Sequence, residues 1–236
     1  MSSTTPLSAD DHRAAPRTET DDPLLLTPEQ AHTLLADAPW RRFAVLGDSI
    51  AAGTGDPSPG YAPTGWADRV AAALTAVQPT LAYRNTGRIG ATSTQVLDRQ
   101  LPEILQFAPD LVHVNCGGND LFEPGADLDR LRENLSTICT ALTATGAQLS
   151  VFTVADVWDV ERMAPMRPMR SKMAALNDIV RAIAADYDAV LTEFWEHPVR
   201  SRPELMSADL LHFTTSGHAV VASEVIKSLG ARIAAA

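Results

Sequence analysis

The chain has 236 residues, of which 45% are hydrophobic and 20% are charged, and its formal net charge is −10. This length predicts one domain or at most two, and the composition excludes disordered, collagen-like and disulfide-stapled proteins. No stretch approaches the roughly 20 apolar residues of a membrane-spanning helix. The acidic balance, with no basic run longer than Arg41-Arg42, argues against nucleic acid and anionic membrane surfaces as partners, because these are bound through basic faces.

The two cysteines, Cys116 and Cys139, are predicted to be buried and reduced. Neither belongs to a Cys-x-x-Cys pair, so zinc and thioredoxin-like sites have no support. Each lies in an apolar stretch, where a thiol acts as a small hydrophobic side chain.

The N-terminal part divides into a polar tail and a short helical extension. Residues 1–22 are rich in Ser, Thr, Asp and Pro and are predicted to be disordered. They lack the basic start and apolar core of a secretory signal, which favours a cytoplasmic location. Residues 23–42 are expected to form a helical extension, since Thr27, Pro28 and Gln30 fit an N-cap, a first helical position and a capping box.

From residue 43 to residue 236 short apolar runs alternate with segments of helical periodicity. The apolar runs, typical of buried parallel strands, cover residues 43–46, 81–84, 111–114, 149–154 and 189–194. The segments expected to be helices cover residues 66–77, 96–107, 128–144, 173–185 and 216–233. Pro102 is expected to kink or divide the second of these helices. This alternation predicts an α/β fold, a three-layer αβα sandwich around a five-stranded parallel sheet.

Ligands bind open α/β sheets beyond the carboxyl ends of the strands, so the segments that follow strands are the first places to look for chemistry. Residues 47–50, Gly-Asp-Ser-Ile, follow the first strand. They lack the last glycine of the Gly-x-Ser-x-Gly nucleophile elbow. Alone, Ser49 or Asp48 is better explained as a helix cap.

Two further segments could supply hydrogen-bond donors. Residues 85–90, Asn-Thr-Gly-Arg-Ile-Gly, follow the second strand and differ from a dinucleotide-binding fingerprint. Alone they form a turn, but Gly87 or Gly90 could offer a backbone N–H to a developing oxyanion. Residues 117–120, Gly-Gly-Asn-Asp, follow the third strand. The amide of Asn119 could donate to the same oxyanion, unless the segment is only a turn or a cap.

The fourth segment is Asp209-Leu210-Leu211-His212. A serine becomes nucleophilic beside a general base, and a histidine base needs a partner that sets its tautomer. This spacing can place both side chains on one side of a turn, although an isolated Asp-x-x-His is common and usually structural. Metal ligation would need further ligands at plausible spacing, and the sequence offers none.

Together the four segments resemble the sequence blocks of the SGNH hydrolases, the GDSL lipase/esterase family. The resemblance covers about residues 43–230 and extends to the order and spacing of the blocks. It departs at Leu210, where the family often has glycine, and at Phe213-Thr214, where it often has Pro-Asn. The resemblance implies the flavodoxin-like topology of SGNH hydrolases for residues 43–236.

The resemblance also implies roles for the matching residues. Ser49 would be the nucleophile, His212 the general base and then the acid, and Asp209 the residue that orients His212. Asp48 and Asp120 would order the loops. No cofactor or metal is implied, and activity should rise with pH through the ionisation of a histidine, whose reference pKa is about 6.5.

The same resemblance implies an oxyanion hole made of the backbone N–H groups of Ser49 and Gly90 and the side-chain amide of Asn119. Gly87, three residues before Gly90, is the competing candidate for the second donor.

Three functions fit this set of residues. The favoured one is a serine esterase or thioesterase that cleaves a small-molecule acyl ester. An acyltransferase using the same acyl-enzyme and a non-catalytic binding protein of the same fold are the alternatives, and the presence of Ser49, Asn119 and His212 together weighs against the last.

Residues 155–170 offer a clue to the substrate. They follow the fourth strand and contain Trp158 and three methionines, so we expect a partly apolar lid over the site. Arg167 or Arg170 could meet an anionic group of the substrate.

Overall fold

The computed structural model describes residues 17–202 and 204–235. Its sheet has five parallel strands in the order β2-β1-β3-β4-β5. They are β1 (Arg42–Gly47), β2 (Ala82–Asn85), β3 (Leu111–Asn115), β4 (Gln148–Phe152) and β5 (Val190–Thr192). This is the flavodoxin-like order, in which β1 and β3 lie side by side and the chain leaves them in opposite directions. The predicted fold class is confirmed, and the site is to be sought where β1 and β3 end.

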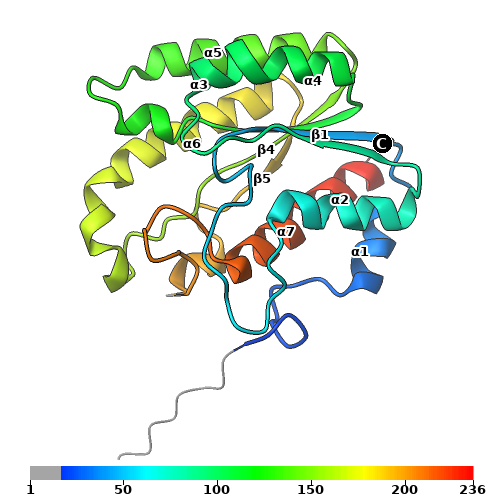
Figure 1. Cartoon of the computed structure of the whole chain (residues 1–236), viewed down its shortest axis with the longest axis horizontal. Coiled ribbons are helices and arrows are strands. Elements are labelled where there is room, and N and C mark those ends of the chain that lie inside the picture. The colour runs from blue at the N-terminus through cyan, green and yellow to red at the C-terminus, as the bar shows by residue number, and fades with distance from the viewer. Residues whose placement is uncertain (1–16, 203, 236) are drawn as a thin grey trace, which may run out of the picture.

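Helices cover both faces of the sheet (Figure 1). One face carries α2 (Trp66–Val77) and α7 (Thr215–Ala234), against which α1 (Pro28–Leu35) packs. The other face carries α4 (Leu101–Phe107), α5 (Leu128–Thr143) and α6 (Arg170–Asp186). The remaining short elements are α3 (Ser93–Gln95), a π-helical turn η1 (Val96–Gln100), and the 3₁₀ helices η2 (Asn119–Phe122), η3 (Glu161–Met169) and η4 (Pro198–Ser201).

The central strands are buried because their apolar residues face helices on both sides. In β1, all residues after Arg42 are buried. Trp66 at the start of α2 is fully buried, and its indole N–H donates to the carbonyl of Ile50 at 2.8 Å. Cys116 and Cys139 are buried and unpaired, as expected.

The helix expected over residues 96–107 is divided, as predicted from Pro102. The π-helical turn η1 precedes α4, and Pro102 lies in the first turn of α4, where its missing N–H is not needed.

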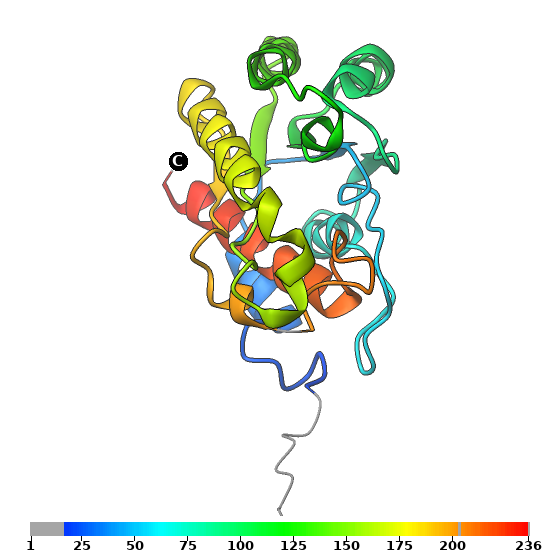
Figure 2. The same ribbon diagram turned by 90° about the vertical axis from the view of Figure 1, so that its left-hand side faces the viewer.

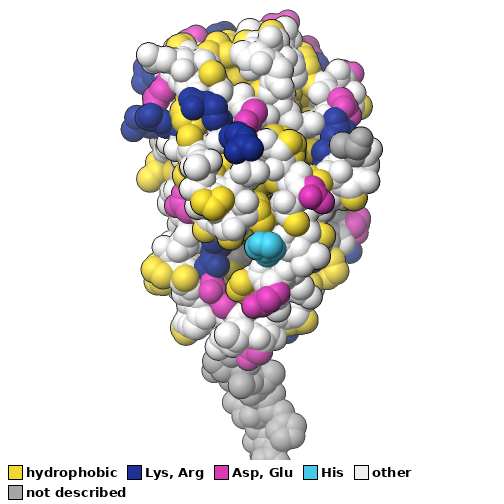
Figure 3. All heavy atoms as spheres, turned by 90° about the vertical axis from the view of Figure 1, so that its right-hand side faces the viewer, with side chains coloured by type: hydrophobic (Ala, Val, Ile, Leu, Met, Phe, Trp, Pro, Cys, Tyr) yellow, Lys and Arg dark blue, Asp and Glu magenta, His cyan; other side chains and the backbone are white. Residues whose placement is uncertain are grey.

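The surface carries charges of both signs. On the face shown in Figure 3, acidic and basic side chains are interspersed among apolar ones and no continuous basic stripe crosses it. Within the two described ranges, no helix combines the length and the apolar character needed to cross a membrane.

The N-terminal segment differs in part from its prediction. The capping box of Thr27 and Gln30 is present at the start of α1. Residues 1–16 of the expected disordered tail lie outside the described residues, but residues 17–22 lie against the folded body. Asp22 is the reason, because its buried carboxylate receives two hydrogen bonds from Arg202, at 2.6 and 2.7 Å, and one from the Tyr61 hydroxyl at 2.8 Å.

Replacing Arg202 with alanine is expected to destabilise the protein by about 3 kcal/mol, because it leaves a buried carboxylate without its cation. Burial raises the pKa of Asp22, but its hydrogen bonds and the positive charge of Arg202 have the larger effect, and the pKa falls to about 2. The stability that the ionised Asp22 contributes is therefore complete above its unfolded pKa of 3.8 and is lost as pH falls through about 2. Urea unfolding at pH 7 measures the effect.

Arg17→Ala is the matched control for this experiment. Arg17 bonds Glu204 at 2.9 Å, but both side chains are about half exposed, so its loss should cost less than about 1 kcal/mol. Equal effects of the two substitutions would show that the buried pair does not anchor the segment.

Candidate active site

Ser49 lies just beyond β1, in a turn that tertiary contacts hold firmly. The strand ends at Gly47 with φ +151°, where an added Cβ would collide with the carbonyl of Asn115. The side chain of Gln100 bonds both the N–H and the carbonyl of Gly47 at 2.8 Å, and the N–H of Asp48 donates to the Asn115 carbonyl at 3.0 Å. Only glycine fits at residue 47, and the backbone that carries Ser49 is tied to the end of β3.

Ser49, His212 and Asp209 form a hydrogen-bonded chain. The Nε2 atom of His212 lies 2.7 Å from the Ser49 hydroxyl oxygen, and its Nδ1 atom lies 2.6 Å from a carboxylate oxygen of Asp209. The other oxygen of Asp209 accepts the backbone N–H groups of Leu211 and His212, at 2.9 and 3.1 Å. Burial raises the pKa of Asp209, but the His212 and backbone bonds outweigh it and hold the pKa below its ordinary value. An ionised Asp209 can therefore fix the tautomer that leaves Nε2 free to take the serine proton.

The Asp209–His212 turn owes its shape to Leu210. Its φ of +63° lies in the left-handed region, which favours glycine. The N–H of Leu210 donates to the Ser207 carbonyl at 3.1 Å, and its side chain lines the site cavity. The departure from the resembled family at this position thus places a leucine in a backbone conformation that glycine adopts without strain.

Three candidate hydrogen-bond donors belong to residues that line one cavity, namely the backbone N–H groups of Ser49 and Gly90 and the side-chain amide of Asn119. Gly90 and Asn119 line the same cavity as Ser49. No described residue accepts a hydrogen bond from the backbone N–H of Ser49 or Gly90. The side-chain nitrogen of Asn119 donates to the Ala91 carbonyl at 3.0 Å, which fixes its orientation and leaves its second hydrogen for a ligand.

The structure distinguishes Gly90 from Gly87. The N–H of Gly87 is already bonded to the side chain of Asn85 at 2.9 Å, and a Cβ there would collide with the backbone of Ala51 and Ala52. Gly87 therefore serves loop packing. Gly90, with φ +75°, is the glycine that faces the cavity.

Asp48 and Asp120 contact loop atoms, as the resemblance implied for loop-ordering residues. Asp120 accepts the backbone N–H of Ser93 at 2.9 Å and also its hydroxyl, which joins the segment after β3 to the start of α3. Asp48 is buried and accepts the backbone N–H of Ile50 at 2.9 Å. Burial raises the pKa of the Asp48 carboxyl to about 7.

Asp48 is expected to make the stability of the protein depend on pH. Between the unfolded value of 3.8 and about 7, the folded protein keeps a proton that the unfolded chain has lost. The contribution of Asp48 to the free energy of unfolding therefore falls by about 4 kcal/mol as pH rises through this interval. Urea unfolding from pH 4 to pH 8 measures this contribution as the difference between wild type and Asp48→Asn, because the effects of the other titrating groups cancel in that difference. Asp98→Asn, at an exposed residue of η1, should follow wild type, and a parallel curve for Asp48→Asn would refute the assignment.

The other buried histidines have structural surroundings. His113 in β3 packs on Trp66 and Phe152, and burial lowers its pKa to about 3. His218 in α7 bonds the Thr54 carbonyl at 3.1 Å, and burial lowers its pKa to about 4. Both side chains are therefore neutral near pH 7. His113 packs within the core, and His218 fixes the loop that contains Thr54.

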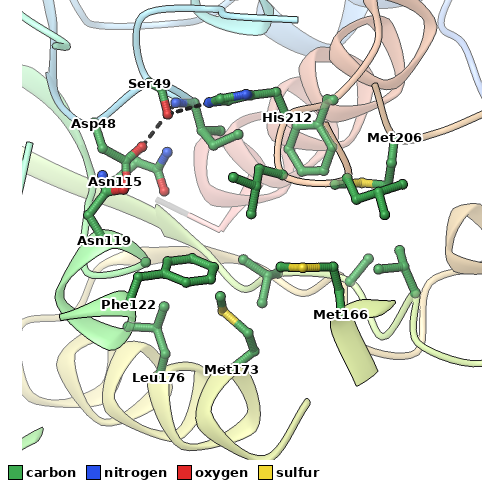
Figure 4. A pocket seen from close by; sticks show the side chains of 18 of the residues that line it. Asp48, Ser49, Asn115, Asn119, Phe122, Met166, Met173, Leu176, Met206 and His212 are labelled. Atoms are coloured by element: carbon green, nitrogen blue, oxygen red, sulfur yellow. Dashed lines mark hydrogen bonds between the residues drawn. The ribbon is translucent and has the colours of Figure 1, made fainter. Parts of the chain in front are cut away.

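The chain of Ser49, His212 and Asp209 opens into an apolar cavity of about 320 Å³. Figure 4 shows Ser49 and His212 at one end, with Phe122, Met166 and Met173 across from them. Sequence reasoning missed most of this wall, which also includes Phe152, Leu176 and Met206. It also missed Asn115, whose side-chain nitrogen is buried without a partner among the described residues. The one signal for Asn115 was a polar residue at the end of an apolar strand.

Residues 155–170, expected as a lid, form a packed wall of this cavity. Residues 161–169 of this segment form η3, and the segment lines the cavity with Val157, Trp158, Met163 and Met166. Figure 2, viewed onto the carboxyl ends of the strands, shows η3 beside the segment that precedes α7. Arg162 joins the two by donating to the carbonyls of Met206 and Ser207, each at 2.9 Å.

The two arginines considered for an anionic substrate are used internally instead. Arg167 donates to the Trp158 carbonyl at 2.9 Å, and Arg170 bonds the buried carboxylate of Asp156, at 2.9 Å for its Nε. Both therefore hold the wall in place. In the part of the chain that the structure describes, no group of three or more His, Cys, Asp or Glu side chains could hold a metal ion.

Comparisons with known proteins identify a family and a fold for the chain. The model of the GDSL-like lipase/acylhydrolase family matches residues 45–220. Among solved structures, the acetylxylan esterase Axe2 from Geobacillus stearothermophilus is 21% identical with a TM-score of 0.66, over 80% of this chain and 94% of that one. The esterase EstA from Pseudoalteromonas sp., in a structure inhibited by monoethylphosphonate, is 21% identical with a TM-score of 0.63. The match covers 82% of this chain and 99% of that one.

A lipase/acylhydrolase from Enterococcus faecalis is similar to the same extent, at 23% identity and a TM-score of 0.64, over 81% of this chain and 96% of that one. No curated protein matches the chain by sequence. These structural likenesses show the fold, and the family model covers most of the chain, including all four candidate segments. The chain belongs to the GDSL-like lipase/acylhydrolase family and is a serine esterase of that family.

Proposed function

We propose that the protein hydrolyses an ester or thioester of a small apolar acyl group through an acyl-enzyme on Ser49. The observation that supports this most strongly is the chain of 2.6 and 2.7 Å hydrogen bonds from Asp209 through His212 to Ser49, at the mouth of an apolar cavity. In this arrangement the proton of the Ser49 hydroxyl passes to Nε2 of His212 as the oxygen attacks the acyl carbon. Asp209 stabilises the imidazolium that results.

The negative charge then forms on the carbonyl oxygen of the substrate. The N–H groups of Ser49 and Gly90 and the amide of Asn119 are the donors proposed for it, because donors that need no rearrangement stabilise this charge best. When the intermediate collapses, His212 returns its proton to the leaving alcohol or thiol. A water molecule, deprotonated by His212, then attacks the acyl carbon, and a second collapse releases the acid and restores Ser49.

A fluorophosphonate tests the nucleophile directly. Wild type should gain the mass of one phosphonyl group, located on Ser49 by peptide mapping, whereas Ser49→Ala and His212→Ala should gain none. Ser201→Ala, at an exposed serine of η4, should be labelled like wild type. A folded wild-type protein that gains no adduct would refute an activated Ser49 and favour the non-catalytic alternative.

The cavity predicts the length of the acyl group. Its 320 Å³ far exceeds the about 10–15 Å³ that one water molecule needs by the same measure, so we take it to hold an acyl chain of about eight carbons. Met166 lies across the cavity from Ser49 and is only partly buried (Figure 4). Met166→Trp should therefore lower kcat/KM for an octanoyl ester by about tenfold and leave an acetyl ester within about twofold. Rates for 4-nitrophenyl esters from two to twelve carbons measure the shift.

Met169→Trp is the matched control, because Met169 ends the same 3₁₀ helix but does not line the cavity. It should keep the wild-type chain-length profile. If Met166→Trp also keeps that profile, the acyl chain does not occupy this cavity.

A further inference from the structure

A second hollow, of about 480 Å³, adjoins the site on the other side of the loop after β2. Ile89 and Gly90 line both hollows. A Cβ placed on Gly90 would meet no described atom within 4 Å, so the passage over Gly90 is open. A substrate whose acyl group fills the apolar cavity can therefore extend its leaving group across Gly90 into the second hollow.

The second hollow differs from the first in its charge. Arg88 and Arg99 line it, both are exposed, and neither side chain has a hydrogen bond or ion pair with any described residue. Its one acidic residue, Glu103, is bonded to Arg84 at 3.1 Å. The hollow therefore offers two guanidinium groups whose donors are free for a ligand.

Unpartnered arginines are unusual among the arginines near the site. Arg162, Arg167 and Arg170 all bond carbonyls or carboxylates that hold the cavity wall. In a chain whose net charge is −10, an anionic substrate is repelled at long range. Its recognition would have to come from local contacts, for which the planar donor array of arginine is well suited.

We propose that the leaving group of the substrate carries an anionic group, a phosphate or a carboxylate, which Arg88 and Arg99 bind in this hollow. The inference rests on the proposed function and adds the class of the leaving group to it. The N–H of Arg88 donates to the carbonyl of Gly47 at 3.1 Å, two residues before Ser49. The anion therefore belongs to a short leaving group, a few bonds from the ester oxygen, as in a phosphorylated polyol.

Matched substrate pairs test this inference. In the first, 1-octanoylglycerol 3-phosphate and 1-octanoylglycerol differ only in the phosphate. In the second, 4-(octanoyloxy)butanoate and its methyl ester differ only in the carboxylate charge. Wild type should prefer the anionic member of at least one pair by about tenfold in kcat/KM, and the pair that shows it identifies the anion. The preference should shrink as ionic strength rises from about 0.05 to 0.5 M, because these guanidinium groups are exposed to salt.

The variants are Arg88→Gln, Arg99→Gln and the double substitution. Each single change should reduce the preference, and the double change should abolish it while activity on the neutral esters stays within about twofold. Arg132→Gln, at an exposed arginine of α5 that lines neither hollow, should keep the full preference.

The outcomes separate this inference from the proposed function. Equal rates on both members of each pair in wild type, or a preference that survives the double substitution, would overturn the arginine site and leave the esterase intact. Failure to cleave any of the four esters, together with no phosphonyl adduct on Ser49, would instead refute the proposed function on which the inference rests.

Discussion

Replacing His212 with alanine is expected to lower kcat/KM for the preferred ester by about 10⁴-fold or more while the protein stays folded. Without Nε2 at 2.7 Å, no base takes the proton of the Ser49 hydroxyl. The loss should appear in kcat, because His212 acts on the reacting atoms and binds little of the ground-state substrate. Steady-state kinetics with a 4-nitrophenyl ester and a thermal unfolding curve measure the two quantities.

His32→Ala, at an exposed histidine of α1, should retain full activity. Ser49→Ala should lose about as much as His212→Ala, and the double variant little more, because the two residues act as a unit. Asp209→Asn should lose less activity than Ser49→Ala or His212→Ala. The Asp209 side chain is 47% exposed, so solvent screens its electrostatic effect on the imidazolium. Independent, additive losses for Ser49 and His212 would contradict the proton transfer between them.

The order of elements and the place of the site followed from local pattern. Short apolar runs and amphipathic segments predicted every strand of the sheet to within a few residues. Parallel strands end at one edge, so Ser49 and Asn119 were expected at that edge, but the strand order that makes their strands neighbours needed the resemblance. Asp209 and His212 needed the resemblance as well, because they follow no strand, and their distance from Ser49 is set by the loop before α7.

The walls of the cavity could not be predicted in the same way. The nine residues of η3 include Pro165 and Pro168 and have no helical periodicity, so tertiary bonds from Arg162 and Arg167 decide their shape. Phe122 and Met206 reach the cavity from segments far apart in the chain. The order of residues 17–22 likewise depends on the ion pair between Asp22 and Arg202, 180 residues apart, which no local pattern reveals.

Replacing Asn119 with alanine is expected to lower kcat by about 10²- to 10³-fold with little change in KM. The amide proposed to donate to the oxyanion is held by its bond to the Ala91 carbonyl, so it needs no rearrangement when the charge forms. The donor matters in the transition state and not in the bound ester, which places its effect in kcat. Kinetics over the acyl-ester series and a thermal unfolding curve provide the measurement.

Asn119→Asp separates electrostatics from packing. Aspartate has nearly the shape of asparagine but replaces the donor with a negative charge, so its loss of kcat should be at least as large as that of alanine. Asn134→Ala, which removes the bonds from α5 to Ser93 and Thr94 at 2.9 and 3.0 Å, should retain most of the activity. A high kcat for Asn119→Asp would show that Asn119 only orders its loop, and the oxyanion would then depend on the backbone donors of Ser49 and Gly90 alone.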